Sequence, residues 1–190
     1  AGTGIFLCKI NSDRQTSGNE PEWSNKAHRQ EFNMVNYAAP RLEKVRIGNI
    51  GIGNRGSSAL RRLLRIEGVE IKAICDIIPE RVRLPLEKID NPQFNPDTYT
   101  GSEDEWKKIC ERGDIDLLYI TTPWALHTPM AVYAMEHGIH AVVEVPAALT
   151  IDECWQLVET SEKTRKHCMM LENCCYVFFE MLTLNMARQG

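Results

Sequence analysis

Three glycines, Gly51, Gly53 and Gly56, stand in the spacing Gly-x-Gly-x-x-Gly between the apolar run 45–50 and a run of helical character at 57–66. Each glycine in this arrangement has a physical reason. The first permits a tight turn, the second lets the backbone approach a pyrophosphate, and the third lets helix and strand pack closely. The free N–H groups and positive dipole end of the following helix would bind the phosphates. The segment therefore predicts a dinucleotide-binding loop.

Three residues near these glycines extend the prediction. Asn54 and Arg55 lie inside the loop, where they can contact phosphate or ribose. Asp76 follows the next apolar run, 69–75, and lies about 20 residues past the last glycine, where a carboxylate binds the ribose hydroxyls of NAD. This order predicts an NAD site. The alternative is a glycine-rich turn in another α/β fold.

Strand and helix patterns alternate from residue 45 onward, which is typical of an α/β fold with a parallel sheet. The predicted strands cover 45–50, 69–75, 116–121, 139–144 and 168–172. The predicted helices cover 54–66, 79–89, 103–112, 129–137, 151–166 and 176–189. Segment 91–101, with two prolines, is predicted to be a loop. With the glycine loop after the first strand, the predicted fold is a Rossmann doubly wound parallel sheet.

Local signals support the predicted helix ends. Pro79 stands at a first helical position, and Thr128 precedes Pro129 as a cap before a first-turn proline. Gly138 is expected to end that helix. The capping-box spacing occurs twice, at Ser102-x-x-Glu105 and Thr150-x-x-Glu153.

Polar residues follow every predicted strand. After the third, fourth and fifth strands come the strings 121–127, 144–146 and 172–176. Ligands bind open parallel sheets outside the carboxyl ends of the strands. We therefore expect one site across this edge of the sheet.

The composition excludes several classes of protein. Among 190 residues, 22 basic and 26 acidic side chains give a net charge of −4 without a basic stripe, which argues against nucleic-acid binding. No apolar run has the length of a membrane span. Seven cysteines, an odd number without Cys-x-x-Cys, favour reduced and mostly buried thiols and no metal site. No signal peptide is visible before Ala1, so a periplasmic protein that lost its leader and a cytoplasmic protein remain alternatives.

Two further motifs follow the glycine loop, Thr-Pro-x-x-x-His at 122–127 and Glu-x-Pro at 144–146. This order resembles the Gfo/Idh/MocA superfamily of NAD(P)-dependent enzymes, named after glucose-fructose oxidoreductase, inositol dehydrogenase and rhizopine catabolism. The usual member has Glu-Lys-Pro, and its lysine assists proton transfer at the substrate. Val145 stands at that position here.

Longer strings make the resemblance more particular. Segments 122–127, 130–138, 143–148 and 168–176 together resemble the NAD-dependent α-N-acetylgalactosaminidases, glycoside hydrolase family 109. That family carries a second domain, mostly an antiparallel sheet, with most substrate contacts and the contact between copies in a homo-oligomer. The resemblance divides this sequence into an irregular arm outside the main fold (1–43), an NAD-binding Rossmann domain (44–175) and a helix (176–190). The helix would lead to a C-terminal domain absent from this chain, which is expected to be a fragment of a longer product.

The resemblance implies tight NAD binding by a defined set of residues. They are Gly51, Gly53, Asn54, Arg55, Gly56, Asp76, Trp124, Ala125, Leu126, His127, Glu144, Val145 and Asn173. Tyr176 is the candidate catalytic acid or base, with the main catalytic residues expected beyond Gly190.

Several of these residues have plainer alternatives. His127 could be a structural histidine, Trp124 a packing residue, and Glu144 a cap for the helix that begins near 151. Tyr176 could be the first core residue of the last helix. The pair Met169-Met170 is predicted to be core strand.

The resemblance also implies a redox-neutral hydrolysis of a carbohydrate substrate with terminal α-linked N-acetylgalactosamine. Oxidation of the sugar 3-hydroxyl, with hydride passing to NAD, makes the neighbouring C2 proton acidic. A base removes that proton, the aglycone leaves by elimination, water adds, and the hydride returns. The alternatives are an NAD-dependent sugar or polyol oxidoreductase, which would accumulate NADH, and a non-catalytic NAD-binding module.

Overall fold

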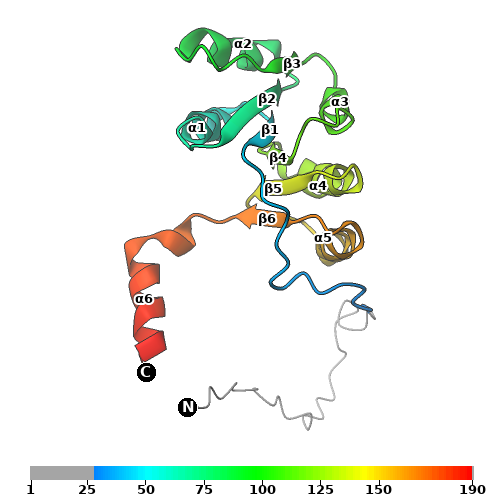
Figure 1. Cartoon of the computed structure of the whole chain (residues 1–190), viewed down its shortest axis with the longest axis vertical. Coiled ribbons are helices and arrows are strands. Elements are labelled where there is room, and N and C mark those ends of the chain that lie inside the picture. The colour runs from blue at the N-terminus through cyan, green and yellow to red at the C-terminus, as the bar shows by residue number, and fades with distance from the viewer. Residues whose placement is uncertain (1–27, 190) are drawn as a thin grey trace.

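The computed structural model describes residues 28–189, so the predictions for residues 1–27 lie outside the described part of the chain. Its centre is a six-stranded parallel sheet with the strand order β3-β2-β1-β4-β5-β6 (Figure 1). The strands are β1 (Val45–Ile50), β2 (Val69–Cys75), β3 (Asp97–Tyr99), β4 (Leu117–Ile120), β5 (His140–Glu144) and β6 (Cys168–Leu171). The α-helices are α1 (Asn54–Leu63), α2 (Pro79–Lys88), α3 (Glu105–Cys110), α4 (His127–Glu136), α5 (Ile151–Thr164) and α6 (Phe178–Gln189). Two 3-10 segments, η2 (Trp124–Leu126) and η3 (Cys174–Tyr176), follow β4 and β6.

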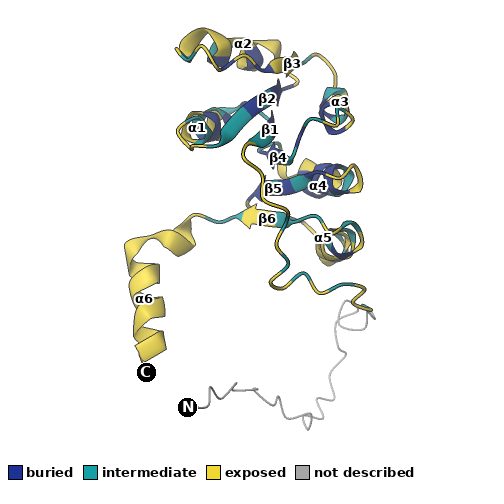
Figure 2. Cartoon of the chain, in the orientation of Figure 1, coloured by how far each residue is buried: buried dark blue, intermediate teal, exposed yellow. Residues whose placement is uncertain are grey.

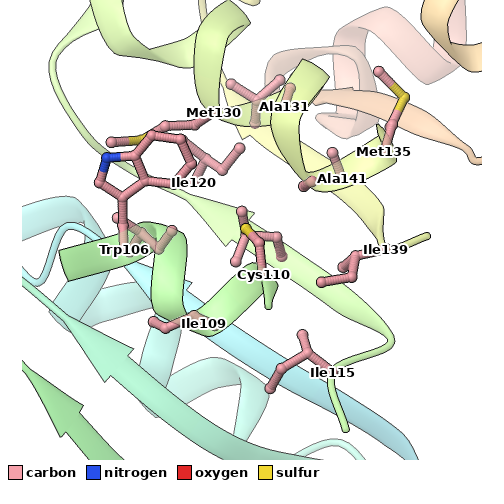
Figure 3. Packing of buried hydrophobic residues seen from close by; sticks show 14 of the residues in the cluster. Trp106, Ile109, Cys110, Ile115, Ile120, Met130, Ala131, Met135, Ile139 and Ala141 are labelled. Carbon is pink, nitrogen blue, oxygen red and sulfur yellow. The ribbon is translucent and has the colours of Figure 1, made fainter. Parts of the chain in front are cut away.

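Apolar side chains form one cluster on each face of the sheet, and Figure 2 shows the buried residues gathered in the central strands and the helix sides that face them. On one face, Trp106 and Ile109 of α3 come together with Met130 of α4 (Figure 3). On the other face, Leu60 of α1 and Val82 of α2 belong to the second cluster. Helices on both faces of a parallel sheet with this strand order confirm the predicted Rossmann doubly wound fold.

The prediction of a loop throughout 91–101 is wrong, because this segment contains the edge strand β3. Ala73 and Cys75 of β2 pair with Asp97 and Tyr99 of β3. The strand is three residues long, and its sequence Asp-Thr-Tyr has no apolar run. Pairing with the free edge of β2, rather than any local pattern, therefore creates the sixth strand.

One of the two predicted capping boxes forms. Thr150 Oγ1 accepts the Glu153 N–H at 3.1 Å, and the Glu153 carboxylate accepts the Thr150 N–H at 3.0 Å, as predicted. The box at Ser102 and Glu105 is wrong. Asp104 is the residue before α3, and the Ser102 hydroxyl oxygen accepts the Asp104 N–H at 3.3 Å instead.

The remaining helix-end signals are confirmed in part. Pro79 is the first residue of α2, and Gly138, with φ +81°, follows the end of α4. The start of α4 differs from the prediction, because this helix begins at His127 and Thr128 lies inside it. The Thr128 hydroxyl donates to the carbonyl oxygen of Ala147 at 3.1 Å, so it ties α4 to the loop after β5 rather than capping its own helix.

The predicted last helix exists as α6, yet none of its residues is buried (Figure 2). Phe178 and Phe179 are 72% and 73% exposed. The neighbouring strand β6 is also open, since Met169 and Met170 are 49% and 44% exposed, and the prediction that they are core residues is wrong. No helix in the described part of the chain, α6 included, is long and apolar enough to cross a membrane.

Six cysteines lie among the described residues, and all are free thiols. Cys75 and Cys110 are buried, and burial raises the pKa of both thiols to about 12. The other four are half-buried or exposed, so the prediction of mostly buried cysteines is wrong. Within residues 28–189, no group of three His, Cys, Asp or Glu side chains is arranged to hold a metal ion.

Residues 28–44 have no helix or strand, but they pack against the domain instead of lying outside it. The buried Glu162 of α5 organises this contact. Its carboxylate accepts the Glu31 N–H at 3.2 Å and a Gln30 amide N–H at 3.4 Å, and it lies 3.3 Å from His28 Nε2. The His28 ring also stacks on Trp155 of α5, with 4.8 Å between ring centroids. The arm is therefore held by polar contacts that converge on one buried carboxylate and by aromatic contacts beside them.

We expect Glu162→Ala to release this arm. The substitution removes the acceptor of several N–H groups, so the free energy of unfolding should fall by about 1–3 kcal/mol and amide exchange at residues 28–32 should accelerate. Glu159→Ala is the matched control, because Glu159 is on the same helix, half-exposed, and 3.7 Å from His28. Its effect on stability should stay within about 0.5 kcal/mol. Equal exchange rates in the two variants would contradict the assignment of Glu162 as the anchor.

Candidate cofactor site

Two of the three loop glycines are required by the fold itself. Gly51 has φ +86°, and a Cβ there would lie 2.6 Å from the backbone oxygen of Thr121. A Cβ on Gly56 would lie 1.8 Å from the carbonyl oxygen of Gly51. The backbone of the β1–α1 loop therefore touches both the end of β4 and the first turn of α1, as the predicted roles of the first and third glycines require.

Gly53 has a different environment. A Cβ at this position would meet only the Arg81 guanidinium, at 3.9 Å, and the φ of −71° is ordinary. Gly53 precedes α1, whose start has no side-chain cap and whose first turn has no acidic residue. The open space at Gly53 therefore faces a helix N-terminus whose N–H groups are available to an anion. These residues fit the pyrophosphate of a dinucleotide.

Asp76 is buried and ties the glycine loop to the end of β2. Its Oδ2 accepts the Ile52 N–H at 2.8 Å, and its Oδ1 accepts the Ile78 N–H at 2.9 Å. The guanidinium of Arg81 lies 3.7 Å from Oδ2. Asp76 thus holds the loop and the start of α2 in place, and its contact with a ribose stays a prediction.

Three predicted site residues that are distant in sequence meet at the carboxyl edge of the sheet. Arg55 Nε lies 2.8 Å from Glu144 Oε1, and Arg55 Nη2 donates to Asn173 Oδ1 at 3.0 Å. The buried Tyr119 hydroxyl donates to the same Glu144 oxygen at 3.3 Å. One arginine from α1 therefore reaches the ends of β5 and β6. The alternative of Glu144 as a helix cap is not found, because Thr150 caps α5 in a capping box with Glu153.

The electrostatics of this bridge follow from its contacts. The hydrogen bond to Glu144, followed by the attraction of its charge, raises the pKa of the Arg55 guanidinium. Burial, and then the nearby charge of Glu144, raises the pKa of Tyr119, so its hydroxyl remains a donor. Glu144 thus accepts from one cationic and one neutral donor.

The segment after β4 presents exposed apolar surface and one buried ring. Trp124, Ala125 and Leu126 are exposed on η2, and Trp124 at 63% exposure is not a core packing residue. His127 is buried, with Nδ1 2.7 Å from the Pro146 carbonyl oxygen and Nε2 2.8 Å from that of Thr122. Both ring nitrogens of His127 are thus engaged by backbone carbonyl groups, and its predicted cofactor contact is untested.

The other predicted residues lie at the same edge. Asn54 is exposed in the first turn of α1, and Val145 is 41% exposed after β5. Tyr176 ends η3 and is 68% exposed, so it is not a core residue of the last helix. Because Tyr176 is mostly exposed, packing does not block its side chain from a substrate. Its catalytic role stays a prediction.

Comparison with known proteins agrees with this geometry. The family model described as the Gfo/Idh/MocA oxidoreductase family, NAD-binding Rossmann fold, matches residues 45–172. This chain belongs to that family. It therefore carries an NAD-binding Rossmann domain, as the glycine loop predicts.

Named relatives within this group include glycosidases. The chain is 56% identical over 160 residues to the glycosyl hydrolase family 109 protein 1 of Bacteroides fragilis, covering 83% of this chain and 34% of that protein. It is 57% identical over 160 residues to an α-N-acetylgalactosaminidase of the same species, covering 83% of this chain and 37% of the relative. The chain thus spans about a third of the length of these relatives. Among solved structures, the WlbA dehydrogenase of Bordetella pertussis in complex with NADH and UDP-GlcNAcA has a TM-score of 0.68 at 20% identity, covering 78% of this chain and 40% of that one.

The sequence analysis missed two residues that contact predicted site residues, Arg81 and Tyr119. Arg81 places a guanidinium between Asp76 and the open space at Gly53. Its position in the first turn of the helix after Asp76 was a usable signal, because that turn faces the glycine loop. Tyr119 supports Glu144 from inside the sheet. A tyrosine within an otherwise aliphatic strand, Leu-Leu-Tyr-Ile, was the available clue.

A pair of glycine substitutions distinguishes the glycine that leaves room for the cofactor from the glycine that the packing of the fold requires. Gly53→Ala should leave the melting temperature nearly unchanged, because its Cβ meets no backbone atom, but should raise the Kd for NAD by about tenfold or more through contact with the pyrophosphate. Gly56→Ala should destabilise the fold by about 3 kcal/mol, because its Cβ collides with a carbonyl oxygen. Calorimetric titration with NAD and thermal unfolding measure the two effects. Unchanged NAD affinity in a folded Gly53→Ala protein would contradict the assigned phosphate site.

A charge-conserving substitution tests the bridge. Arg55→Lys keeps the positive charge but cannot reach Glu144 and Asn173 with two separate nitrogens of one planar group. If the bridge orders the strand ends, the Kd for NAD should rise by about fivefold to tenfold, equivalent to about 1–1.4 kcal/mol. If Arg55 supplies only charge to a phosphate, the Kd should change less than about threefold. Arg61→Lys, in the last turn of α1, is the control and should bind NAD like the unchanged protein.

Proposed function

We propose that the whole protein hydrolyses terminal α-linked N-acetylgalactosamine, with NAD as a recycled cofactor, and that this chain supplies the cofactor side of the active site. The observation that carries the proposal is the 57% identity to a relative named α-N-acetylgalactosaminidase. The geometry supports it, because the strand-end residues that resemble that family lie at one edge of the sheet and Arg55 joins two of them, Glu144 and Asn173.

The roles of the chain's own residues follow from their placement. The α1 N-terminus and the space at Gly53 bind the pyrophosphate, and Asp76 holds that loop to β2. Arg55 fixes Glu144 and Asn173 beside the path of the dinucleotide. Trp124 offers an exposed aromatic wall. Bound NAD supplies a reversible hydride acceptor, while these residues orient it and the sugar against each other.

Val145 favours the glycosidase over a simple alcohol dehydrogenase. A branched aliphatic side chain at this exposed strand end cannot carry a proton, whereas a lysine at the same position could. Proton transfer then falls to Tyr176 or to residues of the whole protein beyond this chain. The same part of the protein would hold most of the carbohydrate substrate and the contact between copies of a homo-oligomer.

The activity test uses the whole protein with an aryl α-N-acetylgalactosaminide and NAD. We expect release of the aryl alcohol without net formation of NADH, because the hydride returns in each turnover. Gly53→Ala is the matched control, since it should keep the fold. Its rate of aryl alcohol release should fall in proportion to its loss of NAD affinity. Accumulation of NADH with a free sugar or polyol would instead support the oxidoreductase. Binding of NAD without turnover of either type of substrate would support the alternative of a non-catalytic NAD-binding module.

A further inference from the structure

The ring of His127 is buried at the carboxyl edge of the sheet, and both of its nitrogens are engaged. It is 1% exposed, and each of its two ring nitrogens lies within 2.8 Å of a backbone carbonyl oxygen. Carbonyl oxygens only accept hydrogen bonds, so the neutral ring donates to one of them and the cationic ring donates to both. Neither nitrogen is left for a ligand or for proton transfer to a substrate.

The two carbonyl groups belong to different strand-end loops. The Thr122 carbonyl lies two residues before Trp124, in the loop after β4. The Pro146 carbonyl follows Glu144 and Val145, in the loop after β5. One side chain therefore links the segment that carries the exposed tryptophan to the segment that carries the Arg55-bound carboxylate.

The next residue strengthens the same connection. The Thr128 hydroxyl, also 1% exposed, donates to the Ala147 carbonyl oxygen at 3.1 Å. His127 and Thr128 are the first two residues of α4, so a rigid helix holds both bonds. The loop after β5 is thus attached to the start of α4 at two consecutive carbonyl groups, and of these two side chains His127 also binds the loop after β4.

We propose that His127 is a positioning residue that fixes the distance between the β4 and β5 loops and thereby shapes the nicotinamide half of the cofactor site. The inference rests on the proposed NAD site. It assigns His127 an action through Trp124, Glu144 and Val145 rather than a contact of its own ring with the cofactor.

The effect should be confined to one half of the dinucleotide. The adenosine and pyrophosphate half faces the glycine loop, which Asp76 holds through the Ile52 N–H, and this contact does not involve α4. The other half would run toward the loops after β4 and β5, which His127 links. Loss of the two hydrogen bonds of His127 should therefore weaken the binding of NAD more than the binding of a ligand that ends at the pyrophosphate.

The experiment compares NAD with ADP as ligands of the whole protein. His127→Phe keeps a ring of similar shape and removes both bonds. His127→Asn keeps an N–H group near the place of Nδ1, and His127→Gln keeps one near the place of Nε2. The Kd for NAD should rise about tenfold in His127→Phe while the Kd for ADP changes less than about threefold, and the Asn and Gln variants should show intermediate ratios. Thr128→Val, which loses one bond to the β5 loop only, should change the ratio less than His127→Phe.

The outcomes distinguish this proposal from the one it rests on. An equal loss of affinity for NAD and for ADP in His127→Phe would show a general structural role. It would overturn the assignment of His127 to the nicotinamide half of the site. An unchanged Kd for both ligands in a folded variant would overturn it as well. Failure of the unchanged protein to bind ADP would instead refute the glycine-loop phosphate site, and with it the basis of both proposals.

Discussion

The carboxyl edge of this sheet depends on a close approach between two stretches of backbone. The β1–α1 turn lies against the end of β4 so tightly that a Cβ on Gly51 would come within 2.6 Å of the Thr121 carbonyl oxygen. A Cβ on Gly56 would collide with the turn from the other side. This approach places the uncapped start of α1 over the crevice between β1 and β4, where the strand order reverses. The N–H groups that are predicted to bind phosphate are therefore a product of helix–strand packing, not of a separate loop added to the fold.

Side chains stabilise this turn in two directions with different strength. Asp76 accepts a buried N–H of the turn, and hydrogen bonds to a charged group are worth about 1.5–3 kcal/mol. Arg55 reaches the other way to Glu144, but its side chain is 47% exposed, and exposed ion pairs contribute about 0–1 kcal/mol. The side of the turn near β2 is thus held more strongly than the side that Arg55 connects to β5 and β6. This asymmetry suits the proposed function, in which the site would hold one end of a dinucleotide and admit a sugar at the other.

The sequence predicted the parts of this arrangement that local patterns determine. Five strands with apolar runs, the glycine loop and the capping box at Thr150 were found because each has a signal within a few residues. The strand β3 was missed, since its pairing with β2 decides its conformation. Met169 and Met170 were misplaced, because an apolar strand reads the same at an edge as in the centre of a sheet.

Contacts between distant segments were also beyond reach from the sequence. The Glu162 carboxylate and the residues 28–31 that bind it are separated by about 130 positions. No local pattern in either segment predicts a contact with the other. His127 was recognised as important from its place after a strand, but its partners are backbone carbonyls, which are present at every residue. Sequence patterns can therefore locate such a side chain without revealing that both of its nitrogens are already engaged.

The distribution of proton-carrying groups limits what this side of the site does in the proposed reaction. Asp76 is bonded to backbone N–H groups, Glu144 accepts from Arg55 and Tyr119, and both nitrogens of His127 face carbonyl groups. The side chain of Val145 has no ionisable group. Of the predicted site residues that can exchange a proton, Tyr176 is the one whose side chain is largely exposed. The Rossmann side is thus built to bind and orient, and an elimination from a sugar would need its base from Tyr176 or from the rest of the whole protein.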